Sequence, residues 1–232
     1  AGNANACTGD QGMAGAKAMV KTTAEELGIA EELVLVSSTG LIGEPFPTEQ
    51  IVEGIKKGVL KLANKTSAGS FLANSILTTD TFAKEGFAQF EIDGQTVNIG
   101  GIAKGSGMIH PNMGTMLAFI ATDVAIEPAL LQCTVQKCVD KSFNMITVDG
   151  DTSTNDMCAV LANGLAENTL LTSEDDPGFA EFEKTLQELM IHLAKLIVSD
   201  GEGASKFIEY KVSHARSEEE ARQLVRSISD SN

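Results

Sequence analysis

The feature of the sequence that most constrains the fold is a pair of alternating apolar segments on either side of Asp93-Gly94. Phe90 and Ile92 alternate with polar neighbours before this dipeptide. Val97 and Ile99 do the same after it. A period of two places apolar side chains on one face of a strand, and Asp-Gly is a favoured two-residue turn. The pattern predicts an antiparallel β-hairpin, which excludes an all-helical fold.

Helical and strand-like segments alternate along the rest of the chain. Apolar residues at helical spacing predict helices over residues 11–27, 49–62, 70–77, 128–143, 177–200 and from 217 onward. Short apolar runs predict strands over residues 33–36, 116–121, 145–148 and 206–212. This alternation is typical of α/β or α+β folds. Because no linker or low-complexity tract interrupts it, residues 1–232 are expected to form a single unit.

The charge balance excludes several classes of partner. The 32 acidic and 17 basic side chains give a net charge of −15, and such a surface repels phosphate backbones. With no Trp and one Tyr, the chain also lacks the aromatic residues on which bases stack. No apolar run approaches the roughly 20 residues that cross a bilayer, and none resembles a signal peptide. We therefore expect neither a nucleic-acid nor a membrane partner.

The four cysteines do not form a recognisable metal motif. Cys7, Cys133, Cys138 and Cys158 include no C-x-x-C pair and have no neighbouring His at zinc-ligand spacing. They are expected to be small buried thiols in a reducing compartment, which predicts an intracellular protein and no metal.

Two polar loops resemble known ligand loops but fail on spacing. In Lys104-Gly105-Ser106-Gly107, a phosphate loop would need a hydroxyl directly after the Lys, where Gly105 stands. A flexible turn with a solvated Lys is the alternative. In Asp149–Asp156, a calcium loop would need Gly at the position of Thr154 and Glu at that of Val160. A polar turn explains this second loop adequately.

A third loop carries a candidate nucleophile. Thr115 follows Gly114 at the head of an apolar segment. This arrangement is compatible with an N-terminal nucleophile, in which the Thr hydroxyl attacks the preceding carbonyl and the freed α-amine then serves as its base. Gly114 would allow a strained scissile bond without a Cβ clash. Gly-Thr before a strand also occurs without such chemistry, so the spacing alone leaves both interpretations open.

Taken together, seven blocks of the chain resemble the ornithine acetyltransferase (glutamate N-acetyltransferase, or ArgJ) family of arginine biosynthesis. In order, they are residues 2–9, 37–43, 78–81, 103–109, 111–119, 149–156 and 200–204. The resemblance covers essentially the whole chain, although the family continues beyond both ends of it. It implies an αββα-like sandwich of the DmpA-like N-terminal-nucleophile kind, with no cofactor and no metal.

The resemblance also implies roles for individual residues. Thr115 would be the nucleophile that takes acetyl from N-acetylornithine and passes it to glutamate. Thr39 and Gly40 would form the oxyanion hole. The positions matching the family's amino-acid substrate site are Thr78, Thr79, Lys104, Thr115 and Glu202. A Lys suits the carboxylate and a Glu the ammonium of an amino acid.

The family's precursor splits before its nucleophile, which here implies cleavage between Gly114 and Thr115. Residues 1–114 would end the α chain and residues 115–232 would begin the β chain, with two copies of each in a cytoplasmic heterotetramer. The family usually has Ala where Gly114 stands, so cleavage is expected at an altered rate. Three questions stay open: whether acetyl-CoA is a second donor, whether the chain is instead a related β-aminopeptidase, and whether it is a non-catalytic remnant.

Overall fold

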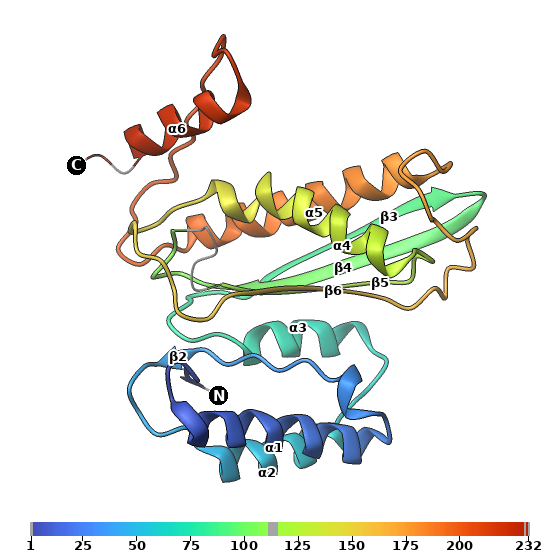
Figure 1. The fold of residues 1–232 in the computed structure, drawn as a ribbon, viewed down its shortest axis with the longest axis vertical. Coiled ribbons are helices and arrows are strands. Elements are labelled where there is room, and N and C mark those ends of the chain that lie inside the picture. The colour runs from blue at the N-terminus through green and yellow to red at the C-terminus, as the bar shows by residue number, and fades with distance from the viewer. Residues whose placement is uncertain (1, 111–115, 230, 232) are drawn as a thin grey trace.

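The chain, described in a computed structural model for residues 2–110, 116–229 and 231, has a mixed α/β fold around a four-stranded sheet (Figure 1). The strands, in their spatial order, are β3 (Lys84–Ile92), β4 (Gln95–Lys104), β5 (Leu117–Thr122) and β6 (Met157–Ala162). β3, β4 and β5 pair antiparallel, and β6 runs parallel to β5. The α/β class is therefore confirmed.

The predicted hairpin is the β3–β4 pair. Phe90 lies opposite Val97, and the turn residues Asp93 and Gly94 have φ of 53° and 78°. Positive φ at both central positions is the geometry that matches the twist of the two strands, and it accounts for the Asp-Gly sequence. The alternating apolar residues on both strands are buried, as the pattern predicts.

Helices α4 (Pro128–Asp140) and α5 (Phe179–Ser199) cover one face of this sheet (Figure 1). The buried face of α5 includes Phe182, Leu186 and Leu193 at helical spacing, and the Phe182 ring lies 6.4 Å from that of Phe90 on β3. Fully burying a side chain of this size stabilises the fold by roughly 1.5–3 kcal/mol. The main hydrophobic core is therefore the interface between these helices and the sheet.

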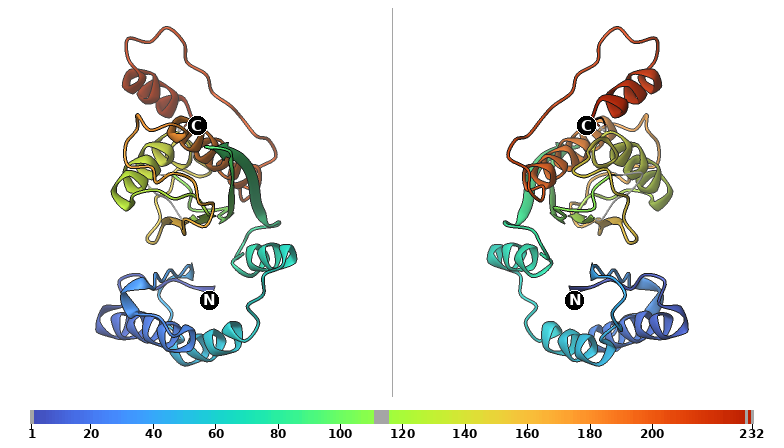
Figure 2. Two further views of the ribbon diagram at one scale, coloured as in Figure 1. Left: turned by 90° about the vertical axis from the view of Figure 1, so that its right-hand side faces the viewer. Right: turned by 90° about the vertical axis from the view of Figure 1, so that its left-hand side faces the viewer.

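A second helical layer precedes the sheet in the chain. It contains α1 (Gly9–Leu27), α2 (Thr48–Val59) and the short parallel strands β1 (Gly2–Asn3) and β2 (Gly40–Leu41). Figure 2 shows α1 and α2 side by side, with α3 (Thr66–Ser75) leading from them to the sheet. Gly28, at φ 66°, ends α1 after Leu27, where the helix predicted over residues 11–27 also ends.

Three predicted strands are wrong. At residues 33–36 a 3-10 helix, η1 (Glu31–Leu33), leads into extended chain. Residues 145–148 begin with the last residue of a second one, η2 (Phe143–Met145). Residues 206–212 form no regular secondary structure, are exposed except for the half-buried Val212, and precede α6 (Glu218–Ser229). A strand requires a hydrogen-bonded neighbour, and none of these three segments has a ladder partner among the described residues. Within the same residues, no helix is long and apolar enough to cross a membrane.

Candidate functional site

The register of the sheet places one end of β4 beside the start of β5. Lys104, the last residue of β4, lies opposite Leu117, the first residue of β5. In the sequence, Leu117 follows the predicted nucleophile Thr115 by two positions. Thr115 and the predicted cleavage partner Gly114 lie outside the described residues.

Lys104 is buried and bonded. It is 2% exposed, and its Nζ donates a hydrogen bond of 2.7 Å to the Thr78 hydroxyl. The same Nζ lies 3.7 Å from Oδ2 of Asp80, which also accepts a 2.7 Å hydrogen bond from the Gly105 amide through Oδ1. Burial lowers the pKa of Lys104, and the Asp80 carboxylate opposes that shift. The alternative of a flexible turn with a solvated Lys is therefore wrong.

Lys84 links Asp80, the neighbour of Lys104, to the loop that contains Asp200. Its Nζ lies 2.7 Å from Asp80 Oδ1 and 2.6 Å from Asp200 Oδ2, and the side chain is 0% exposed. Asp200 also accepts hydrogen bonds from the amide and the hydroxyl of Thr81. Burial alone would raise the pKa of Asp80, but the hydrogen bonds from Lys84 and neighbouring amides hold it below its ordinary value. Two cations and two carboxylates thus form a neutral buried network.

Glu202 belongs to the same region. Its backbone amide donates a 2.7 Å hydrogen bond to the Ser106 carbonyl, and the Ser106 hydroxyl lies 2.8 Å from that of Thr79. The Glu202 carboxylate lies against Gly107, where an added Cβ would come within 2.6 Å of it, so a larger residue there would require the carboxylate to move. The structure therefore brings together the four described residues predicted to bind substrate: Thr78, Thr79, Lys104 and Glu202.

The predicted oxyanion residues lie in the other layer. Thr39 is 5% exposed, and its Oγ1 has no hydrogen-bond partner among the described residues. A buried hydroxyl left unpaired costs about 1–3 kcal/mol. A bound ligand that accepted a hydrogen bond from this hydroxyl would remove that cost. Gly40 has φ of +130°, and a Cβ there would lie 2.2 Å from the Gly2 carbonyl. These two features are compatible with an oxyanion hole, and that role stays a prediction.

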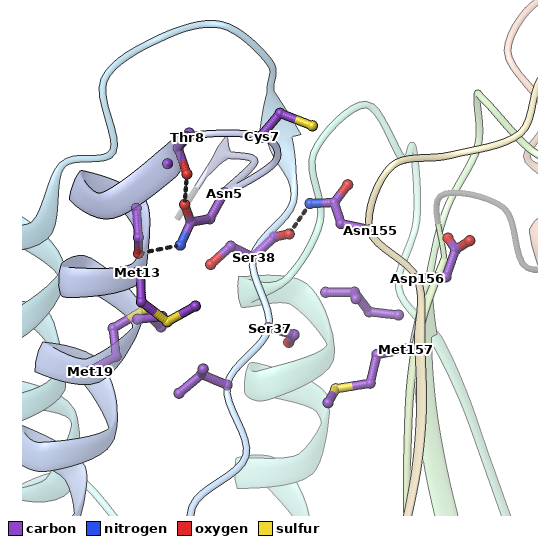
Figure 3. Close-up of a pocket in the computed structure, with 15 residues that line it drawn as sticks. Asn5, Cys7, Thr8, Met13, Met19, Ser37, Ser38, Asn155, Asp156 and Met157 are labelled. Carbon is purple, nitrogen blue, oxygen red and sulfur yellow. Dashed lines mark hydrogen bonds between the residues drawn. The ribbon is translucent and has the colours of Figure 1, made fainter.

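A cavity of about 460 Å³ lies between α1, residues 36–38 and residues 155–157 (Figure 3). Met13 and Met19 of α1 line one side, and Asn155 and Asp156 line the other. The volume is in the range of small-molecule sites. The four described residues predicted to bind substrate do not line it, but Ser38, the residue before Thr39, does.

The sequence interpretation missed the individual roles in the loop Asp149–Asp156. Asp149 accepts hydrogen bonds from the amides of Met108 and Ile109, at 2.5 and 2.9 Å. Asp156 accepts one from the Met116 amide at 2.8 Å, and burial raises the pKa of Asp156 to about 6. The run of side-chain oxygens that resembled a calcium loop was the available signal. Its carboxylates bind backbone amides, and the described residues contain no metal-binding cluster of His, Cys, Asp or Glu.

The cysteines are only in part as predicted. Cys138 is buried and Cys158 half-buried, and burial raises the pKa of these thiols to about 11 and about 12. Both are therefore protonated and unreactive near neutral pH. Cys7 and Cys133 are exposed, so the prediction of buried thiols is wrong for them, because each lies on the solvent side of a loop or helix.

Comparison with known proteins bears on the whole chain. The profile of the ArgJ family matches residues 1–232. Proteins named arginine biosynthesis bifunctional protein ArgJ are 51% identical in Symbiobacterium thermophilum and 52% in Listeria monocytogenes, in each case over 100% of this chain and 57% of the relative. The protein of the same name in Bacillus subtilis is 51% identical over 99% of this chain and 55% of its own length. The chain thus spans little more than half the length of these curated relatives.

Among solved structures, the crystal structure of arginine biosynthesis bifunctional protein argJ from Bacillus halodurans is 44% identical. The superposition has a TM-score of 0.45 and covers 48% of this chain and 57% of that one.

Proposed function

The chain belongs to the ArgJ family, and on that basis we propose that the protein carrying it transfers an acetyl group from N-acetylornithine to glutamate. The observation that supports this best is the cluster of Lys104, Thr78 and Glu202. A buried ammonium and a carboxylate in one cluster complement the opposite charges of an amino acid. The relatives are named as bifunctional proteins of arginine biosynthesis, which agrees with an amino-acid substrate.

In the proposed first half-reaction, the Thr115 hydroxyl attacks the acetyl carbonyl of N-acetylornithine and its proton passes to the Thr115 α-amine. The tetrahedral oxyanion receives hydrogen bonds from the Thr39 hydroxyl and the Gly40 amide. The C–N bond then breaks, the amine of ornithine takes up the proton, and acetyl remains on Thr115. In the second half-reaction the amine of glutamate attacks this ester, which releases N-acetylglutamate and regenerates the hydroxyl.

The free α-amine requires that the bond between Gly114 and Thr115 be cut. We propose that the protein cuts it itself, so that residues 1–114 belong to an α chain and residues 115–232 to a β chain. The proposal includes a heterotetramer of two α and two β chains in the cytoplasm. Acetyl-CoA is proposed as a second donor, in line with the word bifunctional in the relatives' names.

The test combines protein chemistry with a labelled substrate. Intact-mass analysis of the full-length gene product is expected to show two chains, one of them beginning at Thr115. Thr115→Ala should give one uncut chain, and Thr115→Ser should be cut more slowly. A Thr115→Ala protein that still yields a fragment starting at residue 115 would refute the assignment of the nucleophile.

Label from acetyl-labelled N-acetylornithine is expected to appear in N-acetylglutamate. Release of the label as free acetate, with no N-acetylglutamate formed, would instead indicate a hydrolase like the β-aminopeptidases. A correctly folded wild-type protein that stays uncut and inactive would indicate a non-catalytic remnant.

A further inference from the structure

The loop that precedes β6 contacts both predicted halves of the acyl-transfer site. We infer that Asn155 and Asp156 form a brace that holds the Ser38-Thr39 loop and the Met116 amide in a fixed relation, and so positions the oxyanion hole against the nucleophile. The inference rests on the proposed function, because that function assigns the oxyanion hole to Thr39 and Gly40 and the nucleophile to Thr115. The contacts themselves belong to described residues. Figure 3 shows the one between Asn155 and Ser38.

Asn155 makes the first contact. Its side-chain Nδ2 donates a hydrogen bond to the backbone carbonyl of Ser38, the residue before Thr39. The Thr154 hydroxyl lies 3.0 Å from Asn155 Oδ1 and donates to it, which fixes which end of the amide faces Ser38. The backbone N–H of Asn155 donates to the Ser153 hydroxyl at 3.2 Å, which helps to fix the loop backbone that carries this side chain. Asn155 thus donates a hydrogen bond to the Ser38-Thr39 loop.

Asp156 makes the second contact. Its Oδ1 accepts a 2.8 Å hydrogen bond from the Met116 amide, while the Met116 carbonyl accepts one of 3.1 Å from the Met157 amide. Leu117 and Met157 then begin the β5–β6 ladder. The carboxylate therefore supplies an acceptor to the amide that lies just before the ladder. Met116 directly follows Thr115, so Asp156 and Met157 hold the backbone adjoining the predicted nucleophile on both of its polar groups.

Together, the two contacts link a segment of the second helical layer to the main sheet. Ser38 belongs to the segment between η1 and β2, whereas Met116 directly precedes β5 of the main sheet. Thr39 presents a buried hydroxyl without a described partner, and only its correct placement would make that hydroxyl useful to an oxyanion. Asn155 and Asp156 are adjacent in one loop, and they hold Ser38 on one side and Met116 on the other. A misplacement of about 1 Å between such groups can cost about 100-fold in rate.

Three substitutions separate a hydrogen-bonding brace from an acid–base role. Asn155→Asp keeps the shape but replaces the donor toward Ser38 with an acceptor. Asp156→Leu removes the acceptor for the Met116 amide, whereas Asp156→Asn removes the charge and keeps an acceptor oxygen. Asn168→Asp is the matched control, because Asn168 holds Ala125 by its amide in the same way, beyond the opposite end of β5.

The full-length proteins are compared in acetyl transfer to glutamate. Asn155→Asp and Asp156→Leu are expected to lower kcat by about 100-fold. KM should stay within about twofold, because the cluster of Lys104 and Glu202 is untouched. Asp156→Asn and the control Asn168→Asp should keep most of the wild-type kcat. A wild-type kcat in Asn155→Asp, or a loss in Asp156→Asn as large as in Asp156→Leu, would overturn the brace.

Amide hydrogen exchange at Met116 tests the brace independently of activity. Exchange is expected to be faster in Asp156→Leu than in the wild-type protein and little changed in Asp156→Asn. Equal exchange in Asp156→Leu and wild type would overturn the brace, whatever the activity. A wild-type protein that transfers no acetyl would refute the proposed function alone, and the exchange result would still decide the contact.

Discussion

Replacing Lys84 by Met is expected to be among the most destabilising single changes in this chain. Met preserves most of the side-chain length but removes the ammonium that lies 2.7 Å from Asp80 and 2.6 Å from Asp200. All three side chains are at most 3% exposed, so the two carboxylates would stay buried with fewer partners. Breaking a buried ion pair from one side typically costs about 3–5 kcal/mol, because it leaves uncompensated charge.

A surface ion pair of similar length provides the control. Lys57 Nζ lies 2.5 Å from Glu53 Oε1, but these side chains are 69% and 65% exposed. Water solvates both charges whether or not they pair, so Lys57→Met should cost no more than about 1 kcal/mol. The two substitutions remove the same group at almost the same distance. The difference between their losses of unfolding free energy therefore measures the effect of burial rather than that of pairing.

The assay is urea unfolding of the wild-type and variant proteins followed by far-UV circular dichroism, since the chain has no Trp for fluorescence. Unfolding free energies are compared at neutral pH and in mild acid. The loss of unfolding free energy in Lys84→Met should be smaller in acid, because the carboxylates of Asp80 and Asp200 then bind protons and lose their charge. A loss of unfolding free energy no larger than that of Lys57→Met would refute the reasoning. A loss that becomes larger in acid would also refute it.

Lys104→Met should raise KM for N-acetylornithine while self-cleavage persists, since processing needs no substrate; loss of cleavage with KM unchanged in assays of residual activity would contradict this. Thr39→Val should lower kcat by about 100-fold with little change in unfolding free energy, because the hydroxyl has no described partner to lose. Asp156→Asn should be more stable than wild type near neutral pH and equal to it near pH 4. Burial raises the pKa of Asp156 from 3.8 to about 6, so the folded protein bears the cost of the charge only as pH rises through that range; urea unfolding at several pH values checks the trend.

Features that depend on local chemistry could be predicted from the sequence. The β3–β4 hairpin follows from its alternation and from Asp93-Gly94, and the end of α1 follows from Gly28. The start of α6 is another case, because the Glu220 amide donates to the Ser217 hydroxyl at 3.1 Å, as the spacing of a capping box predicts. In each case the residues that decide the geometry are near neighbours in the sequence.

Features that depend on pairing between distant segments could not be predicted. Residues 206–212 have the composition of a strand, but no described segment pairs with them. β6 was missed because Met157–Ala162 is short and mostly apolar, without the alternation that marks a half-buried strand. The same limit applies to Lys104, which the sequence alone allowed to be solvated. Its burial depends on Asp80 and Thr78, more than twenty residues away in the chain.

The two parts of the candidate site are held by different interactions, and this determines how each should fail. The substrate cluster depends on charges: Lys84 holds Asp80 and Asp200, and Asp80 in turn lies beside Lys104. The pKa values of Asp80 and Asp200 are held below the ordinary value of 3.8, so only acid below that pH should protonate them, loosen this cluster and raise KM. The proposed acyl-transfer part depends on two hydrogen bonds with the backbone: Asn155 donates one to the Ser38 carbonyl, and Asp156 accepts one from the Met116 amide. An Asp156 side chain with a pKa of about 6 keeps an acceptor oxygen in either protonation state, so kcat should depend less on its charge. If KM and kcat instead changed together in acid in every variant, the two parts would be one cooperative unit and this division would be wrong.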